Sequence, residues 1–377
     1  FTYTISDGNG GTDTATVNLT IEGVTDDIPS ENVGKATLSI NLNSDNVQIS
    51  NFGNNSFQLT NVGDKNIEQV EIDVTDALYP DSVFDPFGLA GDTTSKALTI
   101  NSSGNTGVVS PNNDASDPNN PTYIGSGGTA GYKGIRLFFD ESVDDGFNPG
   151  ETLGFSIDMD PNSIAGSNKT TIDNASDPTW DVGGVSGAEL IHSTFTTTFS
   201  DGTTASGQLQ GVGNQGGSRG LASQDSPNST ASLTVNGLNP GEVGTYSEDG
   251  PRVFVNGPEG EVARIVLTKG FIQPNSRNEN YDSLSDDLKA QLDALAQEDF
   301  PANNAAEFQT IDWILNGEPQ DISDQFDFSG LANYDFTGED QLPLGFVASI
   351  INSDHNDLPL GAVTDPIYLT FDDGLAM

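Results

Sequence analysis

The first 25 residues read FTYTISDGNGGTDTATVNLTIEGVT, and their pattern is the clearest indication of the fold class. Apolar residues occupy every second position on both sides of a Gly- and Asp-rich turn, namely Phe1, Tyr3 and Ile5 before it and Ala15, Val17, Leu19 and Ile21 after it. Strict alternation is typical of β-strands with one buried face. The stretch therefore predicts a β-hairpin. Because an isolated hairpin is marginal in water, its apolar face needs further strands.

The same alternation recurs along the rest of the chain. Strands are predicted at 36–42, 67–74, 134–139, 153–158, 188–199 and 204–210, and further strands follow within 230–377. Ser200-Asp201-Gly202-Thr203 joins two of these runs and predicts a hairpin turn. We expect an all-β fold of tandem β-sandwich domains, immunoglobulin-like or jelly-roll in style. One short amphipathic helix is expected near 285–297.

The pattern divides the chain into three segments. Residues 1–27 form the hairpin and a linker, 34–215 a β-sandwich that is the candidate ligand-binding domain, and 230–377 a second β-sandwich with the helical insertion. Residues 216–229 (GGSRGLASQDSPNS) are expected to be a linker. Residues 101–131 form a long polar stretch, and loops of this length are usually binding loops or disordered.

The net charge of the chain restricts the classes of partner that it can bind. The chain has 56 Asp and Glu residues against 12 Lys and Arg residues, a formal net charge of −44. This charge excludes nucleic acid and anionic membrane surfaces as direct partners. Two interpretations remain: a solvated acidic surface, and calcium ligation by carboxylate and amide oxygens. We expect calcium for a minority of the acids and solvation for most.

Cysteine and catalytic motifs are both missing from the sequence. An acidic chain without cysteine is expected to be extracellular and stabilised by metal in place of disulfides. No apolar run approaches the roughly 18 residues of a membrane span, so no membrane insertion is expected. The two histidines, His192 and His355, lie far apart, and no metalloprotease, nucleophile-elbow or phosphate-loop motif occurs. We therefore expect no enzyme activity.

A family resemblance is carried by Tyr3 to Val17, YTISDGNGGTDTATV. This string resembles the last two strands of the bacterial cadherin-like repeats, tandem immunoglobulin-like modules of giant calcium-binding adhesins that include those exported with RTX repeats. The resemblance implies that the chain starts inside one repeat, that calcium rigidifies module junctions, and that Asp26 and Asp27 lie where such an ion would bind. Residues 146–151 and 155–161 resemble ligand-projecting β-sandwich domains of such adhesins. A cell-surface or secreted adhesin or biofilm matrix module is the implied function.

Other candidate calcium ligands lie in two places. Asp7, Asn9 and Asp13 form a D-x-N-x-x-x-D turn that can direct several oxygens at one ion, although an ordinary Asx turn explains the same residues. Asp158 and Asp160 lie two apart on a predicted strand, so both face one side. The turn that contains Asp140 and Asp144 is close in sequence and could complete a site there. The alternative for this group is a solvated sheet edge.

Aromatic residues and the hairpin supply the partner predictions. Tyr123, Tyr132 and Trp180 could stack against a glycan, although core packing is the commoner role of Tyr and Trp. Residues 1–25 are expected to pair with a neighbouring repeat of the same polypeptide. If the 377 residues are a complete subunit, the strands would come from another copy, and the chain would be a filament subunit assembled by strand addition.

Overall fold

The computed structural model describes residues 2–16, 32–41, 53–79, 82–90, 95–114, 116–117, 119–125, 131–161, 185–212, 216–225, 229–247, 250–269, 308–328, 344–352 and 358–371. The chain divides into two compact units, residues 1–32 and 33–377. The described part is all-β, as the sequence predicts. Its only helical turns are η2 (Ala188–Leu190) and η5 (Ser323–Gln325), and none of its helices could cross a membrane.

The first unit contains one antiparallel hairpin, β1 (Thr2–Ser6) and β2 (Thr12–Thr16). Tyr3 pairs with Ala15 and Ile5 pairs with Asp13. The predicted hairpin is therefore confirmed over these strands. Its continuation beyond Thr16, with Asp26 and Asp27, lies outside the described residues.

The second unit contains a ten-stranded antiparallel sheet that curls into a half-barrel. In spatial order its strands are β7 (Thr99–Ser102), β10 (Thr152–Ser156), β4 (Phe57–Asn61), β3 (Lys35–Ile40), β14 (Ser218–Ser223), β13 (Thr204–Gly211), β12 (Thr194–Phe199), β5 (Ile67–Asp73), β9 (Gly134–Phe138) and β8 (Tyr123–Ile124). A two-stranded sheet of β6 (Ser82–Phe84) and β11 (Met159–Pro161) accompanies it.

Alternation explains the core of the curled sheet. In β12, TFTTTF, Phe195, Thr197 and Phe199 are buried while the intervening threonines are partly exposed. The turn predicted after β12 is present, because the amide of Thr203 donates to the Asp201 carboxylate (3.0 Å) and Gly202 adopts φ +78°. The alternation of apolar and polar residues is therefore enough to predict β12 and its turn, without knowledge of the strands that pack against them.

Two local predictions were wrong. Residues 188–193, expected as strand, form η2 and a turn in which His192 has φ +73°. Residues 216–229, expected as a linker, contain β14, an internal strand of the curled sheet. The sequence SRGLAS has little apolar alternation, and its pairing with β3 and β13 comes from tertiary context.

The C-terminal part of this unit contains two smaller sheets that share one hydrophobic core. The six-stranded sheet consists of β16 (Val243–Tyr246), β23 (Ile367–Phe371), β21 (Leu344–Asn352), β18 (Val262–Lys269) and β19 (Phe308–Ile314), with β22 (Leu358–Pro359) beside β21. The three-stranded sheet consists of β15 (Ser232–Val235), β17 (Val253–Asn256) and β20 (Gln320–Asp321). The helix expected near 285–297 lies outside the described residues.

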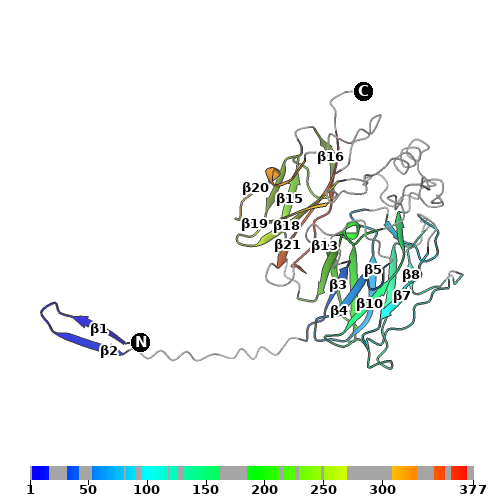
Figure 1. Cartoon of the computed structure of the whole chain (residues 1–377), viewed down its shortest axis with the longest axis horizontal. Helices are drawn as coiled ribbons and strands as arrows, with labels where there is room; N and C mark the ends of the chain where they lie inside the picture. Colours follow the sequence, from blue (N-terminus) through cyan, green and yellow to red (C-terminus); the bar gives the residue numbers. More distant parts are fainter. Residues whose placement is uncertain are drawn as a thin grey trace. The chain divides into compact units, whose positions relative to one another are not determined.

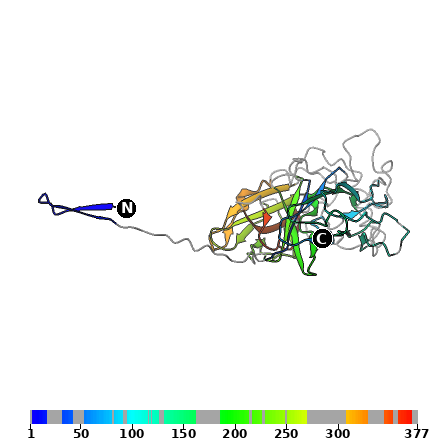
Figure 2. The ribbon, with the colours of Figure 1, turned by 90° about the horizontal axis from the view of Figure 1, so that it is seen from below.

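The curled sheet and the six-stranded sheet lie side by side in both views of the ribbon (Figure 1 and Figure 2). A separate hydrophobic cluster lies between them, built from Leu78, Ala188 and Ile191 on one side and Val266, Val347, Val363 and Tyr368 on the other. We call this cluster, with the polar contacts described below, the seam. It lies within the compact unit of residues 33–377.

Candidate functional site

Asp7 organises the turn between β1 and β2. Its Oδ1 accepts hydrogen bonds from the amides of Asn9 (2.8 Å) and Gly11 (2.9 Å), and these bonds hold the pKa of the carboxyl below its usual range. Asp13 Oδ1 accepts from the amide of Thr14 (2.9 Å). The Asp7 carboxylate therefore stays charged to low pH and acts as the Asx element of the turn. A calcium ion bound at this turn would have to share the Asp7 carboxylate with the amides of Asn9 and Gly11.

The 140–146 turn is organised in a similar way. The hydroxyl and amide of Ser142 donate to the Asp140 carboxylate and hold its pKa below the usual range. Asp144 and Asp145 both adopt positive φ, +46° and +62°. The backbone of the turn is anchored where the amide of Asp140 donates to the carbonyl of Gly107 (2.9 Å).

Asp158 and Asp160 are buried, with exposed fractions of 3% and 0%. They lie beside β6, where Asp160 pairs with Val83 and the carbonyl of Asp158 accepts from the amide of Asp85 (2.8 Å). Burying carboxylates is costly without compensating charge or hydrogen bonds. The solvated-edge interpretation therefore does not describe these two residues in this structure.

Several charged groups surround this buried pair. Asp85, also buried, accepts from the amides of Leu89 (2.9 Å) and Ala90 (2.7 Å). Lys133 is 8% exposed and donates to the carbonyl of Ser82 (2.9 Å). Burial lowers the pKa of Lys96, while the charge of Asp158 acts in the opposite direction. Lys96 is therefore close enough to Asp158 to act as a counter-charge.

The two predicted halves of this site lie on opposite sides of β10 along the chain. The 140–146 turn precedes β10, whereas Asp158 and Asp160 follow it, and a five-residue strand spans about 17 Å. Within the described part of the chain, no three His, Asp or Glu side chains are placed to hold a metal ion. Calcium binding by Asp140, Asp144, Asp158 and Asp160 stays a prediction.

The aromatic residues predicted to stack against a glycan differ in their surroundings. Tyr123 is 4% exposed, its hydroxyl accepts from the amide of Leu98 (3.0 Å), and burial raises its pKa to about 12. Its ring packs against Phe87 and Tyr132, with centroids 5.4 Å and 5.1 Å away. Tyr132 is partly exposed, so its ring offers more surface than that of Tyr123. Trp180 lies outside the described residues.

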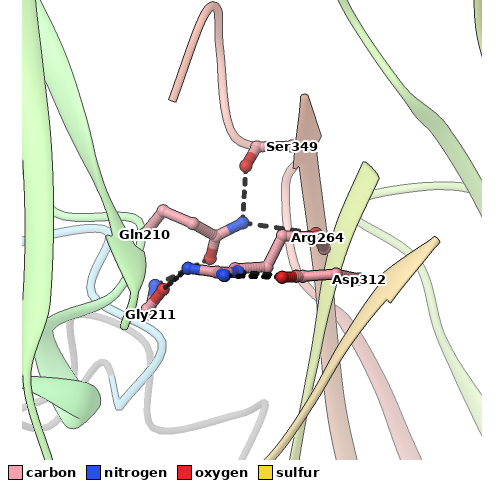
Figure 3. A network of polar contacts seen from close by, with 5 residues as sticks. All are labelled: Gln210, Gly211, Arg264, Asp312 and Ser349. Atoms are coloured by element: carbon pink, nitrogen blue, oxygen red, sulfur yellow. Dashed lines mark hydrogen bonds and ion pairs between the residues drawn. The ribbon is translucent and has the colours of Figure 1, made fainter. Parts of the chain in front are cut away.

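No sequence motif predicts the polar half of the seam, which Figure 3 shows. Arg264 on β18 is 3% exposed and donates from Nε and Nη2 to the two carboxylate oxygens of Asp312 (2.7 Å each). Its Nη1 donates to the carbonyl of Gly211 on β13 (3.1 Å). Gln210 Nε2 donates to Ser349 Oγ on β21 (2.6 Å). The charge-assisted bonds between Arg264 and Asp312 fix the orientation of the two side chains and also add stabilising energy.

His192 belongs to the same seam. Its Nδ1 lies 2.8 Å from the carbonyl oxygen of Asp76, so this nitrogen carries the hydrogen, and its Nε2 lies 3.4 Å from the carboxylate of Asp365. His192 is buried, with an exposed fraction of 3%. One sequence signal pointed toward the seam: Arg264 is a charged residue inside the otherwise apolar run VARIVL.

Comparisons with known proteins add no further constraint on the site. No protein-family model matches the chain, and searches of curated proteins and of solved structures found no match.

Proposed function

We propose that this chain is a calcium-dependent extracellular adhesin or matrix module of a large bacterial surface protein, without enzyme activity. One observation carries the proposal: an Asp- and Gly-rich hairpin forms a unit of its own ahead of a large all-β body. Its sequence resembles the end of a cadherin-like repeat, and such repeats occur in calcium-binding adhesins. A hairpin followed by a body is the arrangement expected where one repeat ends and another module begins.

The finer fold assignment belongs to the same proposal. We infer that the C-terminal sheets form a β-sandwich, because residues of the three-stranded and six-stranded sheets share one core. We infer that the curled sheet with β6 and β11 is the domain that the sequence predicts at 34–215, extended by β14. Tandem domains of this kind suit a surface module, since loops at sheet ends can project toward a ligand.

Calcium is the cofactor that the chemistry favours. A net charge of −44 opposes compaction, and a divalent cation lowers that repulsion wherever it bridges carboxylates. The candidates are Asp7, Asn9 and Asp13 in the hairpin turn, Asp26 and Asp27 after it, and the acidic residues on either side of β10. A glycan ligand at Tyr132 and Trp180, with Tyr123 packed against the ring of Tyr132, completes the adhesin version of the proposal.

The second candidate function is a subunit of an extracellular filament. The observation behind it is the hairpin itself, because within the described residues of its unit only β1 and β2 form a sheet. Ile5 is 62% exposed, and the edges of a two-stranded sheet can accept another strand. A neighbouring copy would then supply the missing strands.

Binding of the full chain to a glycan array separates these functions. The adhesin proposal predicts binding in calcium that disappears with chelator. Equal binding under both conditions, or none, would contradict its glycan part. Head-to-tail polymers seen by electron microscopy, in the absence of any glycan binding, would favour the filament.

A further inference from the structure

The first strand of the compact unit is an internal strand. β3 pairs with β14 from Lys35↔Ser223 to Ile40↔Ser218 and, on its other side, with β4. Contacts begin before the strand itself, because the amide of Gln224 donates to the carbonyl of Gly34 (3.2 Å). The chain is therefore held from both sides where it enters the unit.

The last described strand is internal too. β23 lies between β16, which runs parallel to it, and β21, which runs antiparallel. Ile367 and Leu369 are fully buried in the core. Tyr368 points the other way, into the seam, where its hydroxyl donates to the carbonyl of Leu78 (3.0 Å).

The seam connects these two strands by a short route. β13 lies two strands from β3 in the curled sheet. It contributes Gln208, whose side chain accepts from the amide of Val363 (3.0 Å), and Gln210, which bonds Ser349 on β21. β21 is the direct neighbour of β23. The path from β3 to β23 therefore runs through β14, β13, the seam and β21.

We propose that residues 33–371 form a tension-transmitting link, in which force applied at the two ends passes through β3, the seam and β23. This inference rests on the proposed role as a surface module. An edge strand is held to its sheet by a single ladder of hydrogen bonds. An internal strand pulled from its end must break two ladders, and forced unfolding is governed by that barrier. The seam then prevents the two sheets from separating first.

The absence of cysteine in the chain allows a direct test by single-molecule pulling, because introduced cysteines are unique attachment points. The first variant carries Asn32→Cys and Asp372→Cys, which place the handles just outside β3 and β23. The second carries Ser103→Cys and Asp372→Cys, which load β7, at the end of the curled sheet's strand order, where it pairs with β10 alone. Equal urea midpoints for both variants ensure that only the direction of force differs.

The inference predicts that the first variant ruptures at a force at least about twofold higher than the second, because two ladders break together. Adding Arg264→Met to the first variant should lower its rupture force, while adding Arg252→Ala, an exposed residue away from the seam, should leave it unchanged. Equal rupture forces in the two pulling directions would overturn the inference, as would an unchanged force with Arg264→Met. The test needs neither calcium nor ligand, so its outcome is independent of whether the chain binds either.

Discussion

Arg264 binds both carboxylate oxygens of Asp312 through two hydrogen bonds of 2.7 Å, although its own side chain is 4% exposed and that of Asp312 is 44% exposed. The guanidinium is thus buried while its counter-ion reaches water. Because the remaining nitrogen bonds Gly211 on another sheet, one charged group fixes three strands relative to each other.

Asp312→Ala should destabilise the chain by about 2–3 kcal/mol, because it leaves a buried guanidinium without its counter-charge. Urea unfolding of the full chain measures this change. Arg252→Ala is the matched control, since it removes an exposed ion pair with Asp321 and should cost less than about 1 kcal/mol. Similar losses of unfolding free energy in the two variants would show that the burial of Arg264 does not determine the cost of removing its counter-charge.

Gly207→Ala should also destabilise the chain, by about 1–3 kcal/mol, because an added Cβ would lie 2.3 Å from the carbonyl oxygen of Leu221 on β14. Gly53→Ala is the control, since a Cβ there meets nothing within 4 Å, and it should change stability by less than about 0.5 kcal/mol. Equal unfolding midpoints for the two variants would argue against the close pairing of β13 and β14.

Asp7→Ala should open the turn of the N-terminal hairpin. The pKa of Asp7 is lowered in the folded state by the amides of Asn9 and Gly11, so its contribution is complete above the ordinary Asp range and is lost as pH falls through the lowered value. Protection of the Asn9 and Gly11 amides, measured by NMR as the exchange rate relative to the intrinsic rate at the same pH, should therefore fall in the variant at pH 7 and in the parent only at low pH. Asp13→Ala is the control, and unchanged exchange in Asp7→Ala would contradict the assigned contact.

Deletion of residues 1–25 should abolish any assembly of the chain. The hairpin carries the exposed apolar residue Ile5 and strand edges that can accept a partner. Light scattering and electron microscopy of the intact and truncated chains compare their assembly. Polymers of equal length from both would exclude strand addition through the hairpin.

Local patterns were enough to predict much of the fold. Alternation in TFTTTF and the turn Ser200–Thr203 predict β12 and β13, because both depend on residues adjacent in sequence. β14 could not be predicted in this way. Its Gly220 lies where an added Cβ would meet Phe195, so the strand depends on close approach to a neighbour and not on its own apolar pattern.

The candidate site was less predictable than the fold. Sequence proximity suggested that Asp140 and Asp158 belong together, but β10 separates them along the chain. Buried aromatics cannot be distinguished from ligand platforms by residue type, as Tyr123 shows. The seam joins Gln210, Arg264 and Ser349, which are far apart in sequence and carry no shared motif.

Thermal unfolding of the full chain in calcium and in chelator measures whether calcium stabilises the native state. Calcium that binds only the native state should stabilise it by about 3–4 kcal/mol per site at 100–1,000 times Kd, which raises the midpoint. Magnesium at equal concentration should be a poor substitute, because irregular Asp and Asn turns suit the looser coordination of calcium. A midpoint that is the same in calcium and in chelator, or that magnesium raises equally, would contradict the account.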